Sequence, residues 1–217
     1  MSLNVAHIGE AGRAVAVRRG QRLEYFTIAY NCLEGLIAIV AGALAGSVAL
    51  VGFGFDSLIE VTSGTALLWR LRADHDAGRR KRAERVSLRI VGICFLALAA
   101  YVGYDALVSL LRDETPERSL PGIMLAAASL LVMPLLARAK RVVARELDSG
   151  ALAADARQTE LCTYLSAILL GGLLLNALFG WWWADPAAAL LMTPIIAKEG
   201  VAALRGESCG CAEQTCH

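Results

Sequence analysis

Six long apolar segments make up most of the chain and leave few folds open to it. They run at about residues 23–45, 48–69, 86–111, 121–137, 153–180 and 186–204. Each is close to the ~20 residues that an α-helix needs to cross the hydrocarbon core of a bilayer. The chain is 57% hydrophobic, whereas an ordinary soluble domain is about 45–50% apolar on a similar count. The sequence therefore predicts an all-α membrane protein, a bundle of six transmembrane helices.

Basic residues gather on one side of this predicted bundle. Arginine and lysine are frequent before the first apolar segment, between the second and third, and between the fourth and fifth. The opposite side carries Arg112 and Arg118, diluted by neighbouring acids. Because loops rich in Arg and Lys stay in the cytoplasm, both termini are predicted to be cytoplasmic. Trp181, Trp182 and Trp183 then lie at the outer interface, where aromatic side chains anchor membrane helices.

The predicted chain has three parts. Residues 1–21 form a basic cytoplasmic arm, residues 22–206 a six-helix transmembrane domain, and residues 207–217 a cytoplasmic Cys-rich tail. No apolar core of a signal peptide precedes the first span, so we expect no cleaved leader. The six cysteines are scattered and do not have the spacing of a disulfide framework. No phosphate-binding loop or Ser/His/Asp arrangement is present, so nothing indicates ATP use or an enzyme.

Two acids lie inside the second apolar segment. Asp56 and Glu60 are four residues apart, which puts both carboxylates on one helix face, about 6 Å apart along the axis. An acid near the centre of a membrane helix costs roughly 2.5–3.5 kcal/mol on insertion scales. The pair could simply be neutralised by an Arg of another helix or by protonation, but no Arg or Lys lies within one turn of either acid. We therefore interpret the pair as a cation site or a proton relay that faces the bundle interior.

The fifth apolar segment offers softer side chains. Gln158 and Cys162 are four residues apart and share a helix face, with Asp155 beside it, whereas Glu160 points elsewhere and is expected to pair with an Arg. Carboxylate, thiolate and amide oxygen could together complete a four-coordinate site for a borderline-soft ion such as Zn²⁺. The alternative for Cys162 is a small buried hydrophobe without a metal.

Other polar and small residues of the apolar segments have several interpretations. Glu34, in the first segment, is an extra ligand, an entry residue or a proton acceptor, or it pairs with a polar group of a neighbouring helix. Asp105 is expected to have a hydrogen-bonded structural role or an exit role. The spacing of Gly42 and Gly46 permits a close approach of helices, within the chain or between chains. Gly171, Gly172 and Asn176 in the fifth segment have the same interpretation.

Two groups outside the apolar segments could also bind metal. The tail brings four soft side chains close together in sequence: Cys209, Cys211, Cys216 and His217. Such clusters bind soft metals, although idle thiols in a disordered tail are the alternative. His75 lies between two aspartates, where we expect a solvated loop more than a metal site.

These motifs together resemble the cation diffusion facilitator (cation efflux) family of proton-coupled divalent-metal exporters. The resemblance spans residues 22–206 and rests on Gly46-Ser47 leading to Asp56 and Glu60, on Ala154-Asp155 followed by Cys162, and on Ala184-Asp185-Pro186. The family has His and Asp in the fifth span where this sequence has Gln158 and Cys162, which makes the predicted site softer. The cytoplasmic metal-binding domain that usually follows the sixth span is expected to be absent here.

The resemblance implies a mechanism of alternating access. A divalent ion, Zn²⁺ or a softer ion such as Cd²⁺, would bind between the second and fifth spans as substrate, with no permanently bound cofactor. Protons would then displace it outward, since Asp56 and Glu60 can carry either a divalent cation or protons. The family further implies a homodimer in the lipid bilayer, which we place in a bacterial inner membrane, with no nucleic-acid partner.

Two other functions stay open from the sequence. The chain could be a membrane-anchored metal-binding or sensing protein that acts through its Cys-rich tail. It could also export small organic cations, in which case transport would not depend on the identity of a metal.

Overall fold

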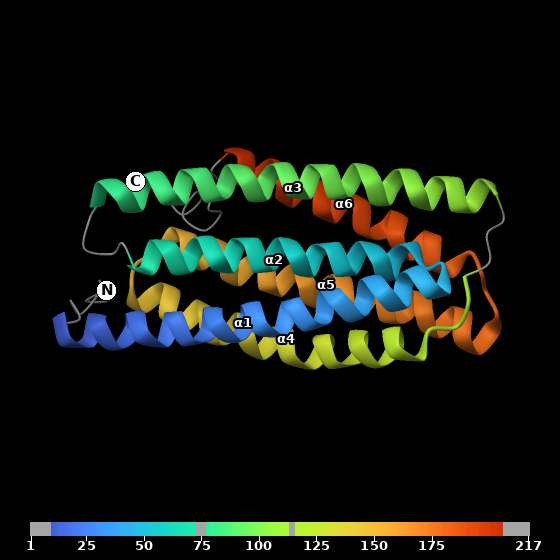
Figure 1. Cartoon of the computed structure of the whole chain (residues 1–217), viewed down its shortest axis with the longest axis horizontal. Helices are drawn as coiled ribbons and strands as arrows, with labels where there is room; N and C mark the ends of the chain where they lie inside the picture. Colours follow the sequence, from blue (N-terminus) through green and yellow to red (C-terminus); the bar gives the residue numbers. More distant parts are fainter. Residues whose placement is uncertain (1–9, 73–76, 113–115, 206–217) are drawn as a thin grey trace, which may run out of the picture.

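A computed structural model describes residues 10–72, 77–112 and 116–205 of the chain. It contains the helices α1 (Glu10–Ala45), α2 (Val48–Arg72), α3 (Ala77–Leu111), α4 (Leu120–Glu146), α5 (Gly150–Phe179) and α6 (Ala184–Arg205). Every regular element in these ranges is a helix, and the helices lie side by side in one elongated bundle (Figure 1). The predicted fold class, an all-α six-helix membrane bundle, is confirmed.

The two ends of the bundle differ. The start of α1, the end of α2, the α4–α5 connection and the end of α6 lie toward one end, on the left of Figure 1, which we call the basic end. The α1–α2 and α5–α6 connections lie at the other end, which we call the turn end. Both described termini are therefore on the same side, as the predicted topology requires. Trp181 and Trp183 stack at 5.3 Å between ring centroids and are partly exposed at the turn end.

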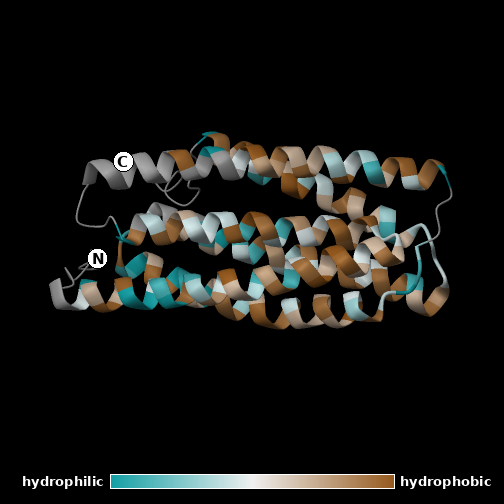
Figure 2. Cartoon of the chain, in the orientation of Figure 1, coloured by the Kyte–Doolittle hydropathy of each residue, from teal (hydrophilic) through white to brown (hydrophobic). Residues whose placement is uncertain are grey.

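Five helices of the described chain are long and apolar enough to cross a membrane, namely α1, α3, α4, α5 and α6. Hydrophobic residues cover most of their length in Figure 2, whereas hydrophilic residues gather near the start of α1. The remaining helix, α2, is 25 residues long but carries both acids together with several Gly, Ser and Thr residues. It contacts α1, α3, α5 and α6. Its polar side chains can therefore lie against protein and not against lipid, which is where intramembrane polar groups are tolerated.

The helices pack mainly in three pairs: α1 with α2, α4 with α5, and α3 with α6. Gly42 and Gly54 bring α1 and α2 into backbone contact. A Cβ atom on Gly42 would lie 2.8 Å from the backbone N of Val51, and one on Gly54 would lie 2.9 Å from the backbone N of Ile39. The close approach predicted at Gly42 is thus made within the chain. Gly46 has a different role, because its φ of +65° forms the turn that ends α1.

Hydrogen bonds tie the connections of the turn end together. Asp185 accepts a hydrogen bond from Ser47 Oγ at 2.5 Å and another from the backbone N–H of Ala49 at 3.3 Å. Asn176 Nδ2 donates to the carbonyl of Pro116 at 2.9 Å. Asp185 is buried in the first turn of α6. It joins the α1–α2 connection to the α5–α6 connection.

Several helices continue past the predicted spans at the basic end. Residues 10–21, expected to belong to a separate arm, are the first part of α1, and α4 continues to Glu146. Arg19 and Glu146 pair at 3.2 Å between these two extensions. The main apolar core of the bundle includes Phe53, Val102 and Met192. A second apolar cluster packs at the basic end, formed by Ala16, Leu67, Leu71, Val143, Ala144, Leu147 and Leu152. The helices are longer than the spans because this cluster gives them apolar partners beyond the membrane-length segments.

Candidate functional site

The acid pair of α2 faces the bundle interior, as predicted. Asp56 and Glu60 are each only 2% exposed. Glu34 of α1 and Cys162 of α5 are buried as well, and these four side chains all lie within electrostatic range of one another. The structure therefore brings together acids and a thiol from three helices. The sequence analysis predicted a site between α2 and α5 and named Glu34 of α1 as a possible extra ligand.

Unpartnered polar atoms are the main chemical feature of this region. Neither carboxylate oxygen of Glu60 has a hydrogen-bond partner in the described structure, and Oε1 of Glu34 and Nε2 of Gln158 also lack one. A buried polar group without a partner costs about 1–3 kcal/mol, and a charged one costs more. Such groups normally bind water, an ion or a ligand. This region can therefore accept a cation or protons.

Hydroxyl groups complete the polar lining. Ser57, one residue after Asp56, donates to Oε2 of Glu34 at 2.9 Å. Ser166 of α5 lies 3.0 Å from the hydroxyl of Ser129 on α4, and donates to the carbonyl of Cys162 at 2.6 Å. Ser57 therefore positions the carboxylate of Glu34 beside the acid pair. This contact agrees with one of the interpretations left open for Glu34, namely pairing with a polar group of a neighbouring helix.

The site is not a ready-made metal centre. In the part of the chain that the structure describes, no three His, Cys, Asp or Glu side chains form a group that could hold a metal ion. Asp56, Glu60 and Cys162 are thus neighbours whose ligand atoms have not converged.

A second buried polar cluster lies on the basic-end side of the acid pair. Lys140 of α4 is 1% exposed. Its Nζ lies 2.5 Å from Oδ2 of Asp155 on α5 and 3.2 Å from Oε2 of Glu24 on α1. Ser63 of α2 donates to the other oxygen of Asp155 at 3.0 Å. Asp155, expected as an accessory residue of the metal site, therefore belongs to this cluster, where Lys140 already neutralises it.

Lys140 and Glu24 are the charged residues of the two clusters that the sequence analysis missed. Lys140 was counted among the basic residues of the loop between the fourth and fifth spans. A signal for its burial was nevertheless present, because Ser129, Met133 and Lys140 continue the inward face of α4 at helical spacing. Glu24 lies at the very start of the predicted first span, where an acid would ordinarily be solvated.

The remaining candidates have different outcomes. Glu160 forms an ion pair with Arg141, which confirms the expected pairing. Asp105 is partly buried on α3. His75 and the tail residues Cys209, Cys211, Cys216 and His217 lie outside the described residues.

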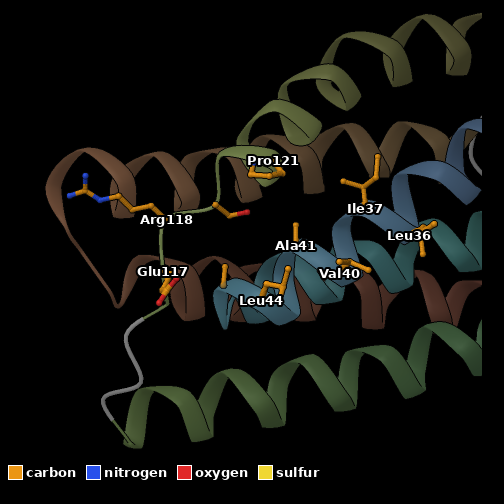
Figure 3. Close-up of a pocket in the computed structure, with 10 residues that line it drawn as sticks. Leu36, Ile37, Val40, Ala41, Leu44, Glu117, Arg118 and Pro121 are labelled. Atoms are coloured by element: carbon orange, nitrogen blue, oxygen red, sulfur yellow. The ribbon is translucent and has the colours of Figure 1, made fainter.

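A groove of about 450 Å³ lies at the turn end, away from Asp56 and Glu60 (Figure 3). Figure 3 shows Leu36, Val40 and Leu44 of α1 on one side and Pro121, at the start of α4, on the other. None of the predicted metal ligands lines it. Leu44 is 80% exposed, so the groove opens on the outer surface of the bundle, which faces lipid in a membrane protein.

The comparisons with known proteins cover most of the membrane-spanning part of the chain. Residues 26–207 match the cation efflux transmembrane domain. The chain is also 27% identical over 178 residues to an uncharacterized transporter of Methanocaldococcus jannaschii. That alignment covers 79% of this chain and 62% of the relative, so the chain spans about three fifths of the length of the relative. The matched region contains both polar clusters except Glu24.

Proposed function

The chain belongs to the cation efflux family, and we propose that it exports divalent metal ions across the membrane in exchange for protons, with the ion held between α2 and α5. Transport of cations across a membrane follows from the family and agrees with the transporter relative. A transporter of this kind is not an enzyme. The metal, the coupling to protons and the residues that bind the ion are our proposal.

The observation that carries the proposal is the unpartnered carboxylate of Glu60 next to Asp56. Two buried acids on one helix face repel each other and lose their hydration, so both cannot stay ionised and alone in a membrane interior. A divalent cation neutralises both charges at once, and so do two protons. One pair of carboxylates therefore supports binding of either species, and competition between them is the physical basis of antiport.

The other ligands would come from α5 and α1. Cys162 offers a thiolate, Gln158 offers an amide oxygen, and Glu34 offers a further carboxylate. Such a mixed set favours Zn²⁺ or Cd²⁺ over Mg²⁺, which prefers six oxygen ligands. Since these atoms do not form a ligand group in the structure, we propose that metal binding draws α5 toward α2 and that this movement is part of alternating access.

The test is a flux assay in proteoliposomes, with a metal-sensitive dye on one side and a pH dye on the other. We expect Zn²⁺ or Cd²⁺ flux with an opposite proton flux, and loss of both in Asp56→Asn. Glu160→Gln is the matched control, because Glu160 is an acid of α5 whose partner is Arg141, and it should keep the flux. The absence of flux from correctly folded wild-type protein would contradict the proposal.

Further variants and substrates separate the alternatives. If the tail were the working part, replacing Cys209, Cys211 and Cys216 by serine would abolish the function in cells, and Asp56→Asn would have no effect. If the substrate were an organic cation, transport would be indifferent to the identity of the metal. The ranking of Zn²⁺, Cd²⁺ and Co²⁺ would show what the thiol of Cys162 contributes to ion selection.

A further inference from the structure

The cluster around Lys140 joins four helices. Lys140 extends from α4, Glu24 from α1, Asp155 from α5 and Ser63 from α2. Two of its contacts, from Lys140 to Glu24 and from Ser63 to Asp155, link the α1–α2 pair to the α4–α5 pair. Those are also the two pairs between which the proposed ion site lies. The cluster therefore closes the same interface that the ion site occupies.

The position of the cluster along the bundle follows from the helix register. Ser63 is one turn beyond Glu60 toward the basic end, and Asp155 is one turn before Gln158 toward the same end. Lys140 is within electrostatic range of Glu60. The cluster is thus the next polar layer between the acid pair and the end of the bundle that the charge distribution predicts to be cytoplasmic.

The cluster holds two acidic side chains and one basic side chain. Two carboxylates surround one ammonium group, and Oε1 of the fully buried Glu24 has no hydrogen-bond partner. Buried ion pairs are seldom needed for stability, since apolar residues of the same volume often serve as well or better. Two buried acids from different helices that enclose a cation have the chemistry of a cation site, and here the cation is a side chain of the same protein.

We propose that Glu24 and Asp155 form a second cation site, occupied in this structure by Lys140, and that Lys140 closes the cytoplasmic end of the ion path until an entering divalent ion displaces it. The inference rests on the proposed function for the existence of that path. Displacement would break the link between Lys140 and Glu24, which lets the α1–α2 and α4–α5 pairs separate at the basic end.

The local packing suits a site with oxygen ligands. Carboxylate oxygens of Glu24 and Asp155 and the hydroxyl of Ser63 are available, and no thiol belongs to the cluster. Gly64, on the turn after Glu60, makes room for Glu24, because a Cβ atom there would lie 3.1 Å from Oε2 of Glu24. The second site is therefore harder than the proposed central site, which contains Cys162.

The direct test counts bound ions. Equilibrium dialysis with Cd²⁺ would be done on the purified full chain with Cys209, Cys211 and Cys216 changed to serine, so that the tail does not contribute. Lys140→Gln is expected to bind one more Cd²⁺ ion per chain than the parent, because the vacated acids accept it. Lys140→Arg, which keeps the positive charge, should bind as many ions as the parent, and adding Asp155→Asn to Lys140→Gln should remove the extra ion.

Equal Cd²⁺ binding by folded Lys140→Gln and Lys140→Arg would overturn the second site. That failure is distinct from failure of the proposed function, which is judged by wild-type flux and its loss in Asp56→Asn. An extra ion in Lys140→Gln without any wild-type flux would support the site and reject the exporter.

A second experiment applies if Lys140→Gln does not fold. The double variant Glu24→Gln/Lys140→Gln removes one charge of each sign, so the net buried charge is unchanged. Ser63→Cys is introduced both into this double variant and into the otherwise wild-type chain, and a water-soluble thiol reagent is added at the basic end. The cysteine is expected to react about tenfold faster in the double variant, because the link across the interface is lost. The same chains with Ser63 give the background labelling. Equal rates would show that Lys140 does not close the path.

Discussion

The buried acids of this chain differ in whether their carboxylate oxygens accept hydrogen bonds. This difference separates acids that stabilise the fold from acids that are candidates for binding an ion. Asp185 is fully buried, yet its two oxygens accept hydrogen bonds from Ser47 and Ala49. It lies near the N-termini of both α2 and α6, where a negative charge is favoured. Glu60 is equally buried but has no partner for either oxygen. A satisfied acid stabilises the fold by itself, whereas an unsatisfied acid needs a ligand or a proton.

Asp185→Ala should therefore destabilise the protein without removing the ion site. We expect a loss of about 1–3 kcal/mol, the cost of leaving buried donors without an acceptor. The measurement is the melting temperature of the purified protein in detergent, together with metal flux per folded molecule. Asp185→Asn retains an oxygen acceptor and should lose less. Loss of flux in a folded Asp185→Ala protein would show that this acid takes part in transport.

The same distinction shows what the sequence could reveal about the site. The spacing of Asp56 and Glu60 was enough to predict a buried pair, because a helix puts such residues on one face. Lys140 was not predicted to be buried, because a basic residue near the end of an apolar segment is ordinarily solvated. Its burial depends on Glu24 and Asp155, which come from helices distant in sequence, and no local pattern reports that pairing.

At the scale of helices, glycine decides how closely α1 and α2 approach. The neighbours of Gly42 are backbone atoms of α2, which cannot move aside as a flexible side chain can. In α5, Gly172 packs against α6, since a Cβ atom there would lie 3.1 Å from the carbonyl of Ala184. The adjacent Gly171 has no neighbour within 4 Å of that position. The packing role predicted for small residues thus holds for Gly42 and Gly172 but not for Gly171.

Gly42→Ala and Gly171→Ala form a matched pair of variants. The first should destabilise the bundle by about 1–3 kcal/mol, because the new methyl group meets the backbone of α2. The second should be neutral or stabilising by up to about 1 kcal/mol, because alanine is the better helix former. Unfolding of the purified proteins in detergent, followed by circular dichroism, measures both. Equal stability of the two variants would mean that α1 and α2 are not in backbone contact.

The helix boundaries show at which end of the bundle the hydropathy pattern predicts the structure and at which end it does not. Hydropathy located the turn-end boundaries closely, as at Ala45 and Val48, because apolar residues stop where the turns begin. At the basic end it stopped short of the helix ends, since α1 and α4 continue as charged helices that leave the apolar pattern. The second apolar cluster that supports these extensions combines residues from four helices, which no window along one helix contains.

At the scale of the whole molecule, orientation determines which end of the ion path faces the cytoplasm. Both described termini lie at the basic end, and the positive-inside rule predicts that this end is cytoplasmic. Arg145, in the last turn of α4, and Arg118, before the start of α4, are both exposed and lie at opposite ends of that helix. Each can be changed to cysteine with the same loss of one positive charge, so the two variants are matched.

Labelling with a thiol reagent that does not cross membranes tests this orientation. In intact cells we expect Arg118→Cys to react above the wild-type background and Arg145→Cys to react only after the cells are permeabilised. The reverse pattern would invert the molecule, and the cluster around Lys140 would then close the outer end of the path. Labelling of both variants in intact cells would indicate a mixed topology, which contradicts the single orientation predicted from the distribution of charge. The assignment of the cluster around Lys140 to the cytoplasmic end of the path therefore depends on the distribution of charge over the whole bundle.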